Sequence, residues 1–208
     1  MSPANALKGL WLAVVLLGSA PHAAAQEQQG VAVLAGGCFW CIEHDLEDLP
    51  GVTSVVSGYA GGAAKTANYK DVSSGNTGHL EVVEVRFNPQ HLSYAELLQV
   101  FWRNIDPTDG GGQFCDRGPQ YRPAIFALDA TQEKIATQSK AALEASGWLP
   151  GPVATEILPA APFYKAEEGH QDYAERNSLR YKYYRFSCGR DARVAKVWAK
   201  APPLTAAE

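Results

Sequence analysis

Residues 35–43 read Ala35-Gly36-Gly37-Cys38-Phe39-Trp40-Cys41-Ile42-Glu43, and the rest of the chain is organised around them. The apolar run before them, Val31–Leu34, predicts a buried strand. Apolar residues at helical spacing follow, between Ile42 and Leu49, and predict a helix. The sequence therefore places Cys38 where a strand turns into a helix.

Cys38 is the best candidate for a nucleophile. Two glycines precede it, so the backbone can turn tightly and leave the thiol uncrowded. A thiol at the N-terminus of a helix lies at the positive end of the helix dipole, which we expect to lower its pKa and favour the thiolate. Phe39 and Trp40 follow and offer an apolar wall. A structural cysteine in a core needs no such arrangement, so we interpret Cys38 as an activated thiol beside an aromatic pocket.

The second cysteine of this stretch, Cys41, lies one helical turn beyond Cys38 and within disulfide reach of it. The pair fits redox chemistry, although Cys-x-x-Cys alone is a weak motif and a small residue facing the core is the alternative. A c-type haem site is excluded, because Ile42 stands where its histidine would be. Cys115 and Cys188 are isolated rather than a second close-spaced pair, so we expect no metal site.

Length and composition predict one domain with a well-formed core. The chain has 208 residues, of which 46% are hydrophobic. Its net charge of −4 gives no reason to expect nucleic acid as a partner. Four cysteines are too few to hold a chain of this length together, which again favours redox chemistry. Basic residues gather toward the C-terminus, and we interpret them as a solvated helix face and tail: Arg176, Arg180, Lys182, Arg185, Arg190, Arg193, Lys196 and Lys200.

Residues 1–25 have the pattern of a signal peptide. Lys8 supplies a positive charge, residues 10–17 form an apolar segment too short to span a membrane, and Ala23-Ala24-Ala25 offers a cleavage site. We therefore expect cleavage near Ala25 and an exported, periplasmic protein, with an uncleaved membrane anchor as the alternative. The mature residues 26–208 are predicted to form one domain, with a core at about 31–185 and a basic, cysteine-containing tail at 186–208.

The order of predicted elements indicates an α+β fold. Strands are predicted at 31–35, 52–59, 80–87, 121–128 and 153–158, and helices at 39–49, 93–105, 131–146 and 167–184. Ser93 and Glu96 form a capping-box pattern at the start of the second helix. Residues 63–78 read as a long polar loop. The β-α-β-β-α-β order is typical of a ferredoxin-like two-layer sandwich, here with extra helices and a long C-terminal tail.

Other polar residues have unremarkable interpretations when each is taken alone. Glu81 lies at the start of an alternating strand, and the simplest interpretation is a glutamate that faces the solvent. If Glu81 instead faces an apolar pocket, its pKa would be raised and its carboxyl could donate a proton. Asp116 and Tyr69 lie in loops and Tyr121 begins a strand. Two histidines, His79 and His170, are interpreted as structural rather than as bases.

Several separated blocks together resemble the peptide methionine sulfoxide reductase A family. The resemblance runs from about Val31 to His170, and its specificity comes from the blocks occurring in the right order. The blocks are Gly37-Cys38-Phe39-Trp40, Gly58-Tyr59-Ala60-Gly61-Gly62, Tyr69 with 74–81, Phe101-Trp102 with Asp106-Pro107-Thr108, Asp116-Arg117-Gly118 with Gln120-Tyr121-Arg122, and 163–167 with His170-Gln171.

The resemblance implies a role for each matching residue. Cys38 would attack the sulfoxide sulfur, and Phe39 and Trp40 would hold the S-methyl group of the substrate. Glu81 would protonate the departing oxygen, which is a poor leaving group until it is protonated. Hydrogen bonds to this oxygen would come from Tyr69 and Tyr121, and Asp116 would help through a bound water. The products would be methionine and a Cys38 sulfenic acid, and the family implies the S epimer of methionine sulfoxide, free or in proteins, as the substrate.

The sequence departs from the common family pattern at the cysteines. Position 41 is often glycine in the family, and many members have a glycine-rich tail with cysteines, whereas this tail carries Cys188 alone. The sulfenic acid needs a second thiol that can reach it. We expect Cys41 to resolve Cys38, with Cys188 next and Cys115 also a candidate. Cys115 and Cys188 would then form a second pair or relay.

The resemblance implies no bound cofactor, a thioredoxin-like dithiol as external reductant, and a monomer. A thiol–disulfide oxidoreductase using Cys38 and Cys41 is the main alternative, although the sequence lacks a thioredoxin-like pattern with its cis-proline. A non-catalytic exported binding or zinc module is a further alternative.

Overall fold

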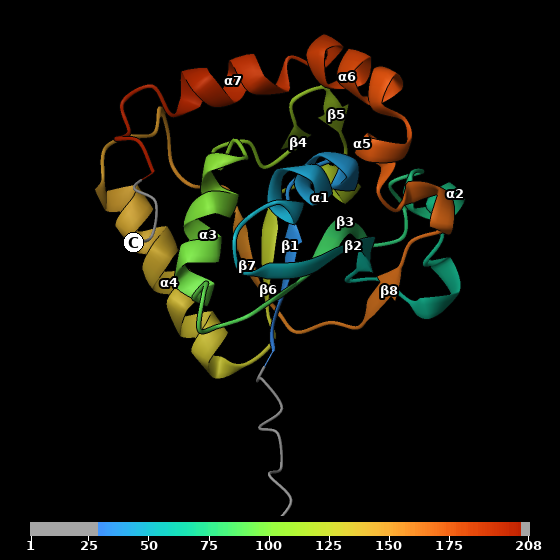
Figure 1. The fold of residues 1–208 in the computed structure, drawn as a ribbon, viewed down its shortest axis with the longest axis horizontal. Helices are drawn as coiled ribbons and strands as arrows, with labels where there is room; N and C mark the ends of the chain where they lie inside the picture. The colour runs from blue at the N-terminus through green and yellow to red at the C-terminus, as the bar shows by residue number, and fades with distance from the viewer. Residues whose placement is uncertain (1–28, 205–208) are drawn as a thin grey trace, which may run out of the picture.

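Six strands form the central sheet of the computed structural model, which describes residues 29–204 (Figure 1). The strands are β1 (Gly30–Ala35), β2 (Val52–Ala60), β3 (Leu80–Phe87), β6 (Ala124–Ala127), β7 (Glu156–Pro159) and β8 (Phe163–Lys165). Their order across the sheet is β7-β6-β1-β3-β2-β8, and all neighbours are antiparallel except β6 and β7. The predicted signal peptide at residues 1–25 lies outside the described residues.

The predicted α+β fold is confirmed. The β-α-β-β-α-β order is present as β1, α1 (Phe39–Glu47), β2, β3, α3 (Tyr94–Arg103) and β6. Side chains alternate between the two faces of a strand, and β1 shows this directly. Ala32 and Leu34 pack in one core cluster with residues of α1, α3 and α4 (Ala130–Ala145), whereas Val33 and Ala35 pack in a second cluster on the opposite face. None of the helices among residues 29–204 is long and apolar enough to cross a membrane.

The capping box predicted for α3 is confirmed. The Ser93 hydroxyl accepts a hydrogen bond from the Glu96 backbone N–H at 3.2 Å, and the Glu96 carboxylate accepts one from the Ser93 N–H at 2.7 Å. This pairing satisfies donors that the first turn of a helix otherwise leaves free. The apolar face of α3, including Leu97 and Phe101, is fully buried.

Two connections that were expected to be simple have more structure than the sequence indicated. Residues 63–78 were predicted as a loop, but they hold a 3₁₀ turn, η1 (Ala64–Thr66), and a short helix, α2 (Tyr69–Val72). The Asn68 side chain caps α2 by accepting from the Asp71 N–H at 3.1 Å. Further on, Asp116 lies in β5 (Asp116–Arg117), which pairs with β4 (Gly112–Gln113), and Tyr121 ends the 3₁₀ turn η2 (Pro119–Tyr121) instead of beginning a strand.

The C-terminal part is broken into short helices, so the predicted helix over 167–184 is wrong as a continuous element. The elements are η3 (Glu168–His170), α5 (Tyr173–Arg176), α6 (Ser178–Ser187) and α7 (Arg190–Val197). Asp172 has a left-handed backbone with φ 51°, which interrupts helical hydrogen bonding before α5. The predicted tail at 186–208 includes α7, and Figure 1 shows α6 and α7 following one another along one side of the molecule.

Arg190 corrects the interpretation of the basic residues as a solvated face. The residue is 1% exposed, and its side chain donates to the Asn104 carbonyl at 2.7 Å. The guanidinium also forms an ion pair with Asp45 at 3.3 Å and lies 4.6 Å from the ring centroid of Phe114. Buried arginine needs such partners because a lone charge is costly away from water. Arg190 therefore fixes the C-terminal helices to the core.

We predict that Arg190→Ala lowers the free energy of unfolding by about 2–4 kcal/mol, because it removes a buried side chain and leaves the Asn104 carbonyl without its donor, while Arg185 keeps its ion pair with Asp45 at 2.6 Å. Arg180→Ala, at an exposed position on α6, is the matched control and should change the free energy of unfolding by less than about 0.5 kcal/mol. Equilibrium denaturation of the disulfide-intact protein measures both values. Equal stability of the two variants would contradict this assignment.

Candidate active site

Cys38 lies between β1 and α1, as the sequence predicted. It is the N-cap residue of α1, and the glycine before it has a φ of 86°. A Cβ atom on Gly37 would lie 2.6 Å from the Cβ atom of Gln113, so both the backbone conformation and the close approach require glycine here. The tight turn brings the Cys38 thiol to the end of the sheet under the C-terminal helices.

Cys38 and Cys41 form a pair of buried free thiols. They are 6% and 1% exposed, and their side chains hydrogen-bond to each other. Burial, together with the neighbouring Cys41 and Glu81, raises the pKa of Cys38. The hydrogen bond from Cys38 and the nearby Arg190 lower the pKa of Cys41 to about 7. The expectation that the helix terminus gives Cys38 a lowered pKa is therefore wrong in this closed structure, where the removal of water dominates.

Glu81 faces the core and not the solvent. On β3 it shares a face with Val83 and Val85, which pack under the helices, and it is 2% exposed. Its carboxyl accepts a hydrogen bond from the Phe39 backbone N–H at 3.1 Å. Burial raises the pKa of Glu81 to about 8, against the opposing effect of that hydrogen bond. Glu81 is therefore largely protonated at neutral pH and can donate a proton beside Cys38.

Tyr69, Tyr121 and Asp116 converge on the same place from α2, η2 and β5. Burial raises the pKa of both tyrosines, and the charge of Glu81 raises them further. Burial also raises the pKa of Asp116. Both phenols stay protonated at neutral pH and can donate hydrogen bonds. The structure thus brings together all five residues that the sequence proposed for catalysis.

The two aromatic residues after Cys38 take different positions. Phe39 is 1% exposed in the core, with its ring centroid 5.9 Å from that of Tyr59. Trp40 is half-buried, and the ring of Tyr173 from α5 stacks on it at a centroid distance of 3.7 Å. The indole N–H of Trp40 donates to Nδ1 of His170 at 3.1 Å. An aromatic wall is therefore present, and α5 covers part of it.

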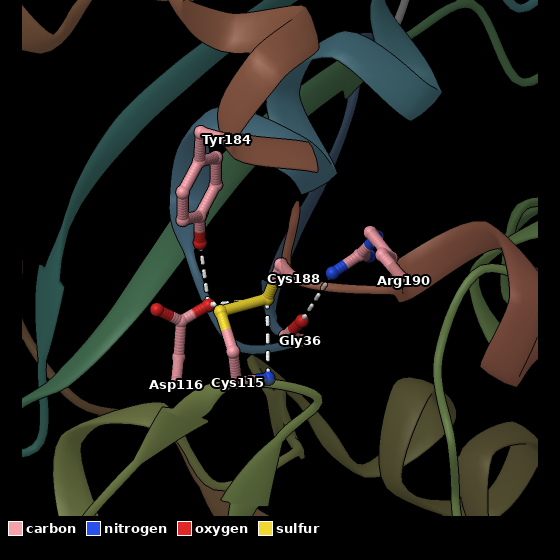
Figure 2. The surroundings of a disulfide bond; sticks show 6 residues. All are labelled: Gly36, Cys115, Asp116, Tyr184, Cys188 and Arg190. Carbon is pink, nitrogen blue, oxygen red and sulfur yellow. Dashed lines mark hydrogen bonds between the residues drawn. A yellow bond between two sulfur atoms is a disulfide. The ribbon is translucent and has the colours of Figure 1, made fainter. Parts of the chain in front are cut away.

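The C-terminal helices close over the thiols, and a disulfide holds them there. Tyr184 of α6 donates a hydrogen bond to Asp116 Oδ2 (Figure 2). A hydrogen bond between Tyr184 and Cys38 works against the rise in the pKa of that thiol. Cys115, beside Asp116, is bonded to Cys188 at the end of α6, with the two Cα atoms 4.9 Å apart. Cys115 is exposed to solvent, whereas Cys38 is buried. The chain therefore has one accessible pair of cysteines and one covered pair.

The residues around the disulfide are the one candidate metal donor set among residues 29–204. The Sγ atoms of Cys115 and Cys188 and a carboxylate oxygen of Asp116 lie within 4.8 Å of one another. Zinc binds thiolates, and sulfur atoms that are bonded to each other carry no thiolate charge. In the disulfide form these residues do not provide a metal site.

Sequence reasoning missed the contributions of His170, Tyr184 and Arg190. The sequence favours a structural role for His170, places Tyr184 at the end of the helix predicted over 167–184, and places Arg190 in the basic tail at 186–208. The only available signal was the i, i+3 spacing of Tyr181 and Tyr184, which places two aromatic rings on one face of α6. That spacing does not indicate which surface the face covers.

Comparison with known proteins identifies the family. A sequence model described as "Peptide methionine sulfoxide reductase" matches residues 30–202. The chain belongs to the peptide methionine sulfoxide reductase family. It is 52% identical to the peptide methionine sulfoxide reductase MsrA 2 of Caulobacter vibrioides over 187 residues, which cover 89% of this chain and 94% of that protein. Identity to the MsrA of Bacillus licheniformis is 45% over 174 residues, which cover 84% of this chain and 96% of that protein.

Solved structures of the same family share the fold. Mxr1 from Saccharomyces cerevisiae in reduced form is 32% identical with a TM-score of 0.67, covering 74% of this chain and 88% of that one. Methionine sulfoxide reductase A of Corynebacterium diphtheriae is 33% identical with a TM-score of 0.65, covering 74% of this chain and 78% of that one. The resemblance inferred from the motifs is confirmed, and with it the prediction of an oxidoreductase that reduces methionine sulfoxide.

We predict how the thiols of this reductase titrate when the Cys115–Cys188 disulfide is intact. The first thiolate should form near pH 7, on Cys41. Cys38→Ala removes the hydrogen bond that lowers the pKa of Cys41, so the transition should move to higher pH. The ultraviolet absorbance of the thiolate, followed against pH, measures both curves. An unchanged midpoint in Cys38→Ala would show that Cys38 does not lower the pKa of Cys41.

Proposed function

We propose that this chain reduces the S epimer of methionine sulfoxide, free or in proteins, with Cys38 as nucleophile and Glu81 as acid. The observation that supports this most strongly is the placement of a buried, largely protonated Glu81 beside Cys38, through the hydrogen bond from the Phe39 N–H. A sulfoxide oxygen leaves readily only when it is protonated, and a carboxyl with a pKa near 8 can supply the proton at neutral pH.

In the proposed reaction the Cys38 sulfur forms a bond to the sulfoxide sulfur while Glu81 gives its proton to the sulfoxide oxygen. The Cys41 thiolate, which is hydrogen-bonded to Cys38, takes the proton of the Cys38 thiol. The S–O bond of the substrate and the new bond between the two sulfur atoms then break, and the protonated oxygen bonds to the Cys38 sulfur. The products are methionine and a Cys38 sulfenic acid, so the substrate is reduced by two electrons and the thiol is oxidised by two.

Tyr69 and Tyr121 are proposed to donate hydrogen bonds to the sulfoxide oxygen, and Asp116 to act through a bound water. Their protonated phenols, near Glu81, support this role. Phe39 and Trp40 are proposed to hold the S-methyl group. Because α5 and α6 cover Trp40 and Cys38, these helices must move aside for the substrate to reach the thiol.

We propose that Cys41 resolves the sulfenic acid, because its side chain already contacts that of Cys38. This step forms the Cys38–Cys41 disulfide and releases water. The exposed pair of Cys115 and Cys188 then acts as a relay: reduced by an external dithiol, it reduces the buried disulfide by thiol–disulfide exchange. The donor is proposed to be thioredoxin-like, and yeast Mxr1, 28% identical with a TM-score of 0.50, is known in complex with Trx2.

The protein is proposed to act as a monomer of one domain, residues 26–208, after export and cleavage near Ala25. Its expected compartment is the periplasm, and an uncleaved anchor is the alternative. The basis is the charge and hydropathy pattern of residues 1–25.

The direct test of this function is activity on methionine sulfoxide of defined configuration with dithiothreitol as reductant. Wild type should reduce the S epimer and not the R epimer, and Cys38→Ser should be inactive because its hydroxyl is a far weaker nucleophile. A fully active Cys38→Ser protein would overturn the mechanism. Reduction of both epimers at equal rates would overturn the proposed specificity.

We predict a basic limb in the pH profile of kcat/KM. Glu81 is active when protonated, so activity should fall as the pH rises through about 8; it should also fall below about pH 7, where Cys41 loses the thiolate that accepts the Cys38 proton. Glu81→Gln should lower the rate by a factor of about 10²–10⁴ and remove the basic limb. If the activity of Glu81→Gln still falls as the pH rises through about 8, another group is responsible for that fall.

The resolving cysteine can be identified after a single turnover without reductant. Mass spectrometry of the digested protein should find a Cys38–Cys41 link in addition to Cys115–Cys188. In Cys41→Ser the Cys38 sulfenic acid should persist and be trapped by a sulfenic-acid reagent such as dimedone. A Cys38–Cys188 link in wild type would contradict the role of Cys41.

A further inference from the structure

His170 lies among the aromatic residues of the site, although the mechanism above does not use it. Its ring centroid is 4.4 Å from that of Tyr69, 5.3 Å from that of Phe39 and 5.7 Å from that of Trp40. The Trp40 ring lies at an interplanar angle of 20° to it, in a stacked arrangement. One half-buried imidazole therefore contacts three residues that are proposed to bind the substrate.

The hydrogen bond from Trp40 fixes the protonation state of His170. The indole Nε1–H can only donate, so His170 Nδ1 must accept and cannot carry a proton. A neutral imidazole satisfies this with its proton on Nε2, whereas an imidazolium has a proton on both nitrogens and cannot. Burial lowers the pKa of His170, which favours the neutral ring, and the charge of Glu167 opposes this effect.

The segment that carries His170 is fixed to the sheet. The buried side chain of Gln171 accepts from the Ser57 N–H at 3.1 Å and donates to the Ser57 carbonyl at 3.0 Å. The Glu167 carboxylate accepts from the Tyr59 hydroxyl and from the Tyr69 backbone N–H, both at 2.8 Å. The imidazole is thus held on a rigid support that also places the start of α2.

We propose that neutral His170 is a positioning residue that fixes the Trp40 indole through Nδ1 and thereby shapes the pocket for the S-methyl group of the substrate. This inference rests on the proposed function of Trp40. The titratable groups that face His170 are Glu167 on its own segment and Tyr69 on α2, while Phe39 and Trp40 of α1 are uncharged. An indole free to rotate about its side-chain torsions would bind the methyl group less well.

Two substitutions separate hydrogen bonding from simple packing. His170→Asn keeps an acceptor oxygen at the place of Nδ1, whereas the amide of His170→Gln lies one bond farther out, near the place of Nε2. In the dithiothreitol assay His170→Gln should raise KM for methionine sulfoxide about tenfold with little change in kcat. His170→Asn should stay within about twofold of wild type. Thermal unfolding of both variants tests whether they are equally stable.

The pH profile provides an independent readout. As the pH falls through the pKa of His170, the wild-type KM should rise, because the imidazolium cannot accept from Trp40. His170→Asn cannot titrate and should lack this rise. Equal KM values for the Asn and Gln variants, or an acid-side rise that persists in His170→Asn, would overturn the proposal. Such a result leaves the role of Cys38 intact, since that role fails only if Cys38→Ser is active.

Discussion

The hydrogen bond from the Phe39 N–H to the Glu81 carboxyl is the contact on which the site depends. It joins the first turn of α1 to β3 across 42 residues of sequence, with a donor–acceptor distance of 3.1 Å. An unpaired buried N–H would cost about 1–3 kcal/mol, so folding itself favours this placement. The same bond sets the acid beside the thiol that precedes Phe39. Fold and chemistry are therefore specified by one contact.

Burial has opposite consequences for the two groups that are proposed to react. It keeps the Glu81 carboxyl protonated, which an acid requires, and it raises the pKa of the Cys38 thiol, which a nucleophile does not require. In the proposed reaction Cys41 compensates, because its thiolate is hydrogen-bonded to Cys38 and can accept the proton. The helices that provide this burial are fixed by Arg190 and by the Cys115–Cys188 disulfide.

The sequence was sufficient for the parts of the structure that local patterns determine. The strand-to-helix turn at Cys38 and the capped start of α3 follow from glycine, apolar spacing and the Ser93–Glu96 pattern. The burial of Glu81 and of Arg190 did not follow, because it depends on elements far away in the sequence. Family resemblance named the reacting residues, and only the packing of α5 and α6 showed that the thiols are covered.

The proposed reaction requires Glu81 to be protonated beside Cys38 at neutral pH. Difference infrared spectroscopy of wild type minus Glu81→Gln measures this directly, since the carbonyl stretch of a protonated carboxyl is separate from the carboxylate bands. A protonated Glu81 should give a carbonyl band at about pH 6 that disappears as the pH rises through about 8. A carboxylate signal already present at about pH 6 would contradict this role of Glu81.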